Sequence, residues 1–182
     1  MMAVVKSGEA ASRRNLRTQL VLERITGRTE SNTFTSSAMQ QGIDREVDAQ
    51  AAYERLTGSP LVRTGFLRHD ELMAGASLDG HVGDFDSIIE IKCPLAATHL
   101  SYLRTGEVPW NYAVQVTHAL WLTGAESCDW FSYNPDFPPA LQIKMVRVWR
   151  DDGLVQNYEQ RVRQFLAEVD AEEMEVRGML AA

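Results

Sequence analysis

Three charged side chains, Asp79, Glu90 and Lys92, have the types and the spacing that could act on a phosphate ester. Glu90 and Lys92 lie two residues apart in the run SIIEIKC at 87–93, whose β-branched isoleucines predict a strand. Side chains two residues apart on a strand project from the same face. A hairpin with the strand predicted at 74–80 would bring Asp79 beside Glu90. Two carboxylates and one ammonium group would then converge on one point.

This grouping is what metal-dependent cleavage of a phosphodiester requires. Mg²⁺ prefers oxygen ligands, and the carboxylates of Asp79 and Glu90 with the backbone carbonyl of Ile91 would supply them. A bound Mg²⁺, or alternatively Mn²⁺, lowers the pKa of a coordinated water and stabilises charge on the phosphate. Lys92 could orient that water or stabilise the developing charge.

A plainer interpretation competes with this one, because an E-x-K pair on a strand is often a solvated surface pair. The Ile-rich surroundings of Glu90 and Lys92 favour a buried central strand instead. Charged residues are rare in such strands unless they are paired or functional. We therefore interpret Asp79, Glu90 and Lys92 as a catalytic group.

The elements that must position these residues form a mixed pattern. Apolar periodicity predicts helices, and β-branched runs bounded by Gly and Pro predict strands. Their order predicts an α/β (α+β) fold with a central mixed sheet flanked by helices, and the chain length suggests a single domain over 1–182. The predicted helices are 12–26, 40–57, 97–104, 110–123 and 152–181, the predicted strands are 61–67, 74–80, 87–93, 127–135 and 141–149, and 27–39 is predicted to be a loop.

Two of the predicted helices carry further candidates. Glu46, on the helix at 40–57, shares a partly apolar face with Ala49, Gln50 and Tyr53. Gln115 lies in the helix at 110–123, which is apolar nearly all round, so its amide would be buried and must find partners. The partner of Gln115 could be backbone, Lys92 or the attacking water.

Composition narrows the classes of function. The chain has 182 residues, a net charge of -7 and 45% hydrophobic residues, which are globular values. The acidic balance argues against a protein that coats DNA non-specifically, but it allows local DNA binding through a basic patch and metal ions. We find no apolar run of membrane-spanning length, and two cysteines cannot form a disulfide framework, so we expect a cytoplasmic protein.

The pattern Asp79…Glu90-x-Lys92 matches the PD-(D/E)xK nucleases, and the wider run GASLDG…EIKCP resembles the phage lambda exonuclease family, also called YqaJ-like viral recombinases. The segment QQGIDREVDAQAAYE at 40–54 resembles that family's helix with an active-site Glu, here Glu46. The segment NYAVQVTHALWLTG at 111–124 resembles its Y-x-x-Q-x-Q helix, with Gln115 at the first Gln and Thr117 in place of the second. With the run FSYNPDFP, the resemblance covers roughly residues 15–170 and implies a restriction-endonuclease-like core.

The chain departs from the family pattern in two places. Ser77-Leu78-Asp79-Gly80 stands where the family usually has S-P-D-G. The family's Arg-containing segment followed by I-T-A-S, which in the lambda enzyme helps to hold the DNA 5′ phosphate, is not found. Two explanations stay open: either the chain is truncated, or Arg13, Arg14 or Arg17, in the basic concentration within residues 1–30, holds the DNA end in its place.

The resemblance implies a Mg²⁺-dependent exonuclease that digests one strand of linear duplex DNA from 5′ to 3′ in phage recombination. It also implies a 3′ single strand left for an annealing protein, and a homo-oligomeric ring, commonly a trimer, around the DNA. A restriction- or repair-type endonuclease on the same core is one alternative, and a non-catalytic DNA-binding subunit is another.

Overall fold

The computed structural model describes residues 9–29 and 37–179, without the side chains of residues 37–39 and 41. The chain divides into two units, one made of residues 1–34 and 156–182 and the other of residues 35–155. All three residues of the predicted catalytic group lie in the second unit. None of the helices in the described residues is both long and apolar enough to cross a membrane.

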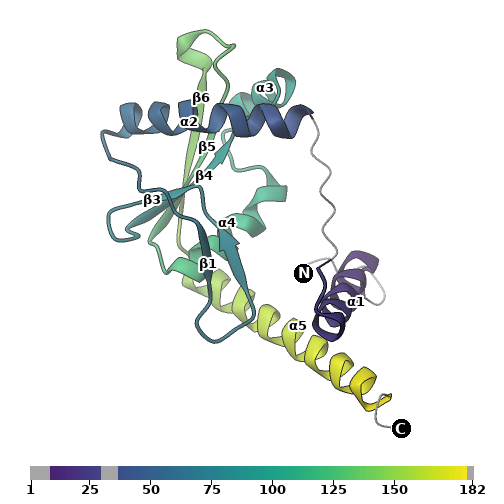
Figure 1. The fold of residues 1–182 in the computed structure, drawn as a ribbon. Coiled ribbons are helices and arrows are strands. Elements are labelled where there is room, and N and C mark those ends of the chain that lie inside the picture. The colour runs from purple at the N-terminus through teal and green to yellow at the C-terminus, as the bar shows by residue number, and fades with distance from the viewer. Residues whose placement is uncertain (1–8, 30–36, 180–182) are drawn as a thin grey trace. The chain divides into compact units, whose positions relative to one another are not determined.

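A four-stranded sheet forms the centre of the 35–155 unit, in the order β3, β4, β5, β6 (Figure 1). β4 and β5 pair in parallel, while β3 and β6 pair antiparallel with their neighbours. The sheet is therefore mixed and flanked by helices, as predicted. The strands span Gly80–Val82 (β3), Ser87–Lys92 (β4), Ser127–Tyr133 (β5) and Ile143–Trp149 (β6).

The inner strand β4 carries the predicted E-x-K pair. Every residue of β4 except Lys92 is buried, which agrees with the prediction of a buried central strand. Alternation along the strand divides its side chains between two apolar layers. Ile89 and Ile91 belong to one layer, and Ile88 belongs to the other. Glu90 and Lys92 lie two and four residues after Ile88, so their side chains are on the same face of the strand as Ile88.

Helix α2 (Ser37–Thr57) covers the face of the sheet that carries Ile89 and Ile91. It packs there through Ala49, Ala52 and Tyr53, which are at most 3% exposed. The small side chains of the two alanines let the helix approach the sheet closely. Tyr53 also packs edge-on against Phe131 of β5, with the ring centroids 5.6 Å apart.

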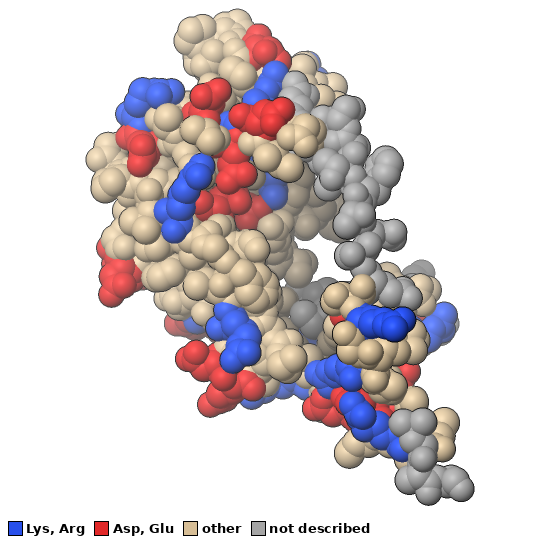
Figure 2. Space-filling model, viewed as in Figure 1, with Lys and Arg blue, Asp and Glu red and all other residues tan. Residues whose placement is uncertain are grey.

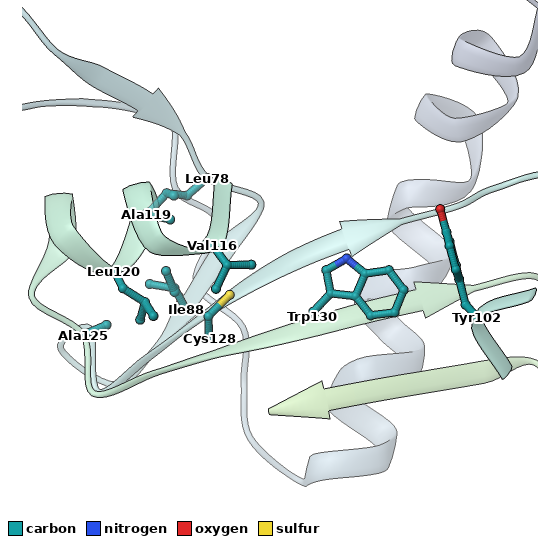
Figure 3. Close-up of a cluster of buried hydrophobic side chains, with 9 residues drawn as sticks. All are labelled: Leu78, Ile88, Tyr102, Val116, Ala119, Leu120, Ala125, Cys128 and Trp130. Atoms are coloured by element: carbon teal, nitrogen blue, oxygen red, sulfur yellow. The ribbon is translucent and has the colours of Figure 1, made fainter. Parts of the chain in front are cut away.

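Helices α3 (Ala96–Thr105) and α4 (Trp110–Thr123) contribute to the apolar layer on the opposite face. Figure 3 shows this layer, in which Val116 and Leu120 of α4 meet Ile88, Cys128 and Trp130 of the sheet. The face of the sheet that α4 covers is thus apolar around Ile88. Glu90 and Lys92 extend the same face toward the end of β4.

The strand predictions for residues 61–80 were only partly correct. β1 (Phe66–Arg68) and β2 (Gly75–Ser77) pair with each other as a separate two-stranded sheet, and Val62 makes a single bridge to His81. The hairpin partner of β4 is instead β3, which begins at Gly80. A Cβ on Gly80 would lie 2.9 Å from the Val62 carbonyl oxygen, so this close crossing of backbones requires glycine.

Two predictions for α2 also need correction. The predicted loop at 27–39 ends earlier, because α2 begins at Ser37; residues 30–36 lie outside the described residues. Ile43 and Val47 belong to the apolar periodicity from which this helix is predicted, yet their side chains are 58% and 60% exposed. The stripe that is buried passes instead through Ala49, Ala52 and Tyr53, which pack with Ile89, Ile91 and Phe131 of the sheet.

One further element lies in the 35–155 unit, and a helix pair forms the core of the other unit. A 3-10 helix (Pro139–Leu141) joins β5 to β6. In the other unit α1 (Ala11–Thr26) packs against the later part of α5 (Asp152–Met179), where Val21, Phe165 and Val169 are buried together.

Candidate active site

Asp79 is held against β4 by its own carboxylate. The register of the β3–β4 hairpin pairs Gly80 with Ile89, so Asp79 stands opposite Glu90 when this register is extended by one residue. Asp79 Oδ2 accepts a hydrogen bond of 2.6 Å from the backbone N–H of Ile91. The predicted meeting of Asp79 and Glu90 therefore occurs, although it involves β3 and not a continuous strand at 74–80.

Glu90 is the centre of a hydrogen-bonded group. Its side chain is 6% exposed, and its Oε1 accepts hydrogen bonds from both Lys92 Nζ and Gln115 Nε2. The Gln115 bond is 2.7 Å long. Lys92 Nζ also lies 4.9 Å from the ring centroid of Tyr112, which places the cation over an aromatic face. β4 and α4 thus meet at this carboxylate.

Gln115 differs from its prediction in two respects. It is an exposed residue and not a buried one, because its side of α4 leaves the apolar layer. Its partner is Glu90, whereas backbone, Lys92 or a water had been expected. Thr117, at the family's second Gln position, bonds back to the Ala113 carbonyl within its own helix.

Glu46 of α2 lies at a cavity that Asp79 and Lys92 also line. This cavity measures about 450 Å³, and Glu46, Asp79 and Lys92 contribute its charged lining. Gln50, one turn further along α2, donates a hydrogen bond of 3.4 Å to Glu46 Oε1. The face of α2 predicted for Glu46 is confirmed, since Ala49, Gln50 and Tyr53 are all buried.

The local field acts most strongly on Asp79. Burial, together with the nearby negative charge of Glu90, raises the pKa of Asp79 to about 6, while the Ile91 N–H and Lys92 act in the opposite direction. A buried carboxyl group beside a second carboxylate is an electrostatic arrangement that a cation would relieve. Figure 2 shows acidic side chains gathered in the middle of the 35–155 unit, with Lys and Arg side chains around them.

Sequence reasoning missed three residues of this site. Tyr112 and Cys93 both line the cavity, and burial raises the pKa of the Cys93 thiol to about 11, so the thiol is protonated at neutral pH. Trp130 pairs with Glu90 across β4 and β5, and its buried indole N–H has no hydrogen-bond partner within the described residues. The Y-x-x-Q spacing in α4 was the one sequence signal that pointed to Tyr112.

The comparisons with known proteins agree with this geometry. The model of the YqaJ-like viral recombinase domain matches residues 2–126 of the chain. The chain belongs to this family. Among the curated proteins, none matches the chain.

Solved structures place this YqaJ-like chain among exonucleases in fold. The alkaline exonuclease LHK-Exo from Laribacter hongkongensis is 36% identical, with a TM-score of 0.86 over 96% of this chain and 88% of that one. A second structure of LHK-Exo, in complex with dAMP, is 37% identical with the same TM-score and covers 95% of this chain and 87% of that one. A phage-related exonuclease from Haemophilus somnus shares the fold at 16% identity, with a TM-score of 0.72 over 92% of this chain and 85% of that one.

The donor set of the YqaJ-like site fits a hard cation with an incomplete protein shell. Within the described residues, no group of three His, Cys, Asp or Glu side chains is arranged to hold a metal. Asp79 uses Oδ2 and Glu90 uses Oε1 in hydrogen bonds, which leaves one oxygen on each carboxylate. Mg²⁺ commonly takes one or two carboxylates and keeps several waters, so Asp79, Glu90 and the Ile91 carbonyl form a suitable set.

The arginines predicted to contact DNA lie in the other unit. Arg13 and Arg17 of α1 both form ion pairs with Glu9 and with Glu168 of α5, and Arg17 bonds Glu172 at 2.7 Å. Arg14 is exposed. The structure thus gives Arg13 and Arg17 a structural role, and DNA contact by this helix stays a prediction.

Proposed function

We propose that this chain is a metal-dependent DNA exonuclease. The observation that carries the proposal is the grouping of Asp79, Glu90 and Lys92: Asp79 and Lys92 line one cavity, and Glu90 accepts hydrogen bonds from Lys92 and Gln115. Membership of the YqaJ-like family and the likeness to LHK-Exo support it. The LHK-Exo complex with dAMP adds that this relative binds a deoxynucleoside monophosphate, the product class of DNA exonucleolysis.

Each residue has a task in this proposal. Asp79, Glu90 and the Ile91 carbonyl would hold Mg²⁺ or Mn²⁺, and Glu46 would contribute to a second or shared position. The metal, when bound, supplies an acidified water and stabilises charge on the phosphate. Lys92 leaves Glu90 to stabilise charge on the phosphodiester or to orient the water, while Gln115 keeps Glu90 in place.

The finer proposals concern the substrate and the assembly. We propose digestion from 5′ to 3′ of linear duplex DNA ends, leaving a 3′ single strand for an annealing protein in phage recombination. A homo-oligomeric ring, commonly a trimer in the family, would keep an acidic chain on DNA, because a closed ring replaces part of the electrostatic attraction. The proposed compartment is the cytoplasm of a bacterial host.

The deciding experiment compares linear with closed circular duplex DNA, labelled at either the 5′ or the 3′ end, with Mg²⁺ and with a chelator. We expect mononucleotides from linear DNA only, in Mg²⁺ only, with early loss of the 5′ label. Cutting of circles would mean an endonuclease, and no cutting of either DNA would mean a non-catalytic binding subunit. Asp79→Ala, Glu90→Ala and Lys92→Ala should each abolish cleavage in a folded protein.

A further inference from the structure

Few cations near the candidate active site are free to meet a phosphate. Lys92, which is bonded to Glu90, is already assigned to the phosphodiester that is cut or to its attacking water, and Arg45 of α2 is bonded to Asp136 at 2.7 Å and to Asn134 at 3.3 Å. The cavity itself is lined by Glu46 and Asp79, and the whole chain has a net charge of -7. A polyanion that approaches this cavity therefore needs another fixed cation at its edge.

Arg63 meets this requirement. It is an exposed residue in the segment between α2 and β1, and its Nε donates a hydrogen bond of 2.9 Å to Gln50 Oε1. Gln50 is only 9% exposed, so the acceptor that holds Arg63 is itself fixed. No acidic side chain pairs with Arg63 in the described part of the chain. The N–H groups on the two terminal nitrogens of the Arg63 guanidinium therefore remain available as hydrogen-bond donors.

Gln50 also fixes where Arg63 stands relative to the cavity. Its amide nitrogen donates to Glu46 Oε1 while its amide oxygen accepts from Arg63. One glutamine side chain thus joins the cavity-lining Glu46 to Arg63. Gln50 lies four residues, or about 6 Å along the helix axis, beyond Glu46. Through Gln50, Arg63 is therefore linked by two hydrogen bonds to Glu46, a residue that lines the cavity.

We propose that Arg63 binds a backbone phosphate of the DNA strand next to the phosphodiester that is cut, with Gln50 as the residue that orients it. The free terminal N–H groups suit the oxygens of a phosphate, which accept paired hydrogen bonds from an arginine. The contact is to the backbone, so it adds affinity without selecting a base sequence. This inference rests on the proposed function, since the substrate is the same DNA.

The test measures binding of a short fluorescent 5′-phosphorylated duplex, in Ca²⁺ in place of Mg²⁺, across a salt series. The proteins are wild type, Arg63→Ala, Arg63→Lys and the matched control Arg45→Ala. One phosphate contact contributes about 0.9 to the slope of log affinity against log salt. We expect Arg63→Ala to lower the slope by about that amount and to weaken binding roughly tenfold.

The two other variants should separate charge from bulk. Arg63→Lys keeps a cation and should keep most of the slope, while Arg45→Ala removes a charge that Asp136 already neutralises and should leave the slope unchanged. In steady-state cleavage with Mg²⁺, Arg63→Ala should raise KM for DNA with kcat within about twofold of wild type.

Three outcomes overturn the inference in distinguishable ways. If wild type binds and cuts DNA while Arg63→Ala has the wild-type slope and KM, Arg63 contacts no phosphate and the proposed function stands. If wild type neither binds nor cuts DNA, the proposed function and this inference fail together. An equal loss of slope in Arg45→Ala would also overturn it, because the effect would then come from net charge alone.

Discussion

The side-chain amide of Gln115 donates a hydrogen bond of 2.7 Å to Oε1 of Glu90, and this bond connects α4 to the inner strand β4. Lys92 donates to the same oxygen, so two donors fix one carboxylate. The free Oε2 of Glu90 is thereby oriented for a further ligand. Gln115 acts on the chemistry through Glu90, which makes it a positioning residue.

Gln115→Ala should lower kcat by about 10- to 100-fold, as is typical when a residue that orients a metal ligand is lost. KM for DNA should change little, because Gln115 need not touch the substrate. The fold should survive, since Gln115 is exposed. Steady-state kinetics and a thermal melt check this. The control is Thr117→Ala, because Thr117 lies two residues further along α4 and its hydroxyl bonds within its own helix. Equal kinetic losses in both variants would contradict the positioning role of Gln115.

Asp79→Asn should stabilise the metal-free protein at neutral pH. The folded state raises the pKa of Asp79 to about 6, so between about pH 4 and pH 6 the folded chain binds a proton that the unfolded chain releases. The favourable contribution of the protonated form is complete below pH 4 and is lost as the pH rises through 6. Asparagine keeps a neutral side chain at every pH.

The expected gain for Asp79→Asn is of order 1–3 kcal/mol at pH 7–8, or a few degrees in Tm, and it should vanish near pH 4. Thermal melts in a chelator across pH 4–8 measure it. Asp84→Asn, in the exposed turn before β4, should show no comparable pH-dependent gain. A Tm for Asp79→Asn that tracks wild type at all pH values would mean that burial of the charge costs nothing.

Glu46→Gln should raise the Mg²⁺ concentration needed for half-maximal cleavage. Glu46 lines the cavity with Asp79, and two cations about 3.5–4 Å apart would need a carboxylate on this side. A titration of cleavage rate against Mg²⁺ tests this. Glu54→Gln, two turns further along α2, is the control, because the Glu54 side chain instead accepts the Leu61 N–H. An unchanged titration curve would make Glu46 an ordinary helix residue.

Arg13→Ala with Arg17→Ala should lower the stability of the unit formed by α1 and the later part of α5. The double change leaves Glu168 and Glu172 without their arginine partners, and each of these partly exposed pairs contributes about 0.2–1 kcal/mol. Thermal melts at low and high salt should show a loss that shrinks as salt screens the acids. Arg14→Ala should leave the melt unchanged.

The same variants test the predicted DNA contact of this helix. A salt slope reduced by about 0.9 in Arg14→Ala would support contact through the exposed arginine. A slope reduced by about two units in the double variant would mean that Arg13 and Arg17 exchange their glutamates for phosphates. Wild-type slopes in all variants would leave the helix with a structural role alone.

The sequence by itself determined the mixed fold, the inner strand β4 and the grouping of Asp79, Glu90 and Lys92. These were predictable because strand alternation and a tight hairpin are local, and an Ile-rich strand with two charged residues is unusual. The resemblance to the YqaJ-like family added Glu46 and Gln115, which are far from β4 in sequence.

The tertiary structure alone decided which partners these residues take. Alternation cannot say which helix covers a face, so the bond from Gln115 to Glu90 depends on how α4 packs on the sheet. The bond from Arg63 to Gln50 depends on the path of the chain after α2. The basic run of α1 could be counted in the sequence, but its neutralisation by Glu168 depends on a contact 155 residues away. Charge in a sequence is additive, whereas the charge available to a ligand depends on which ion pairs the fold has already formed.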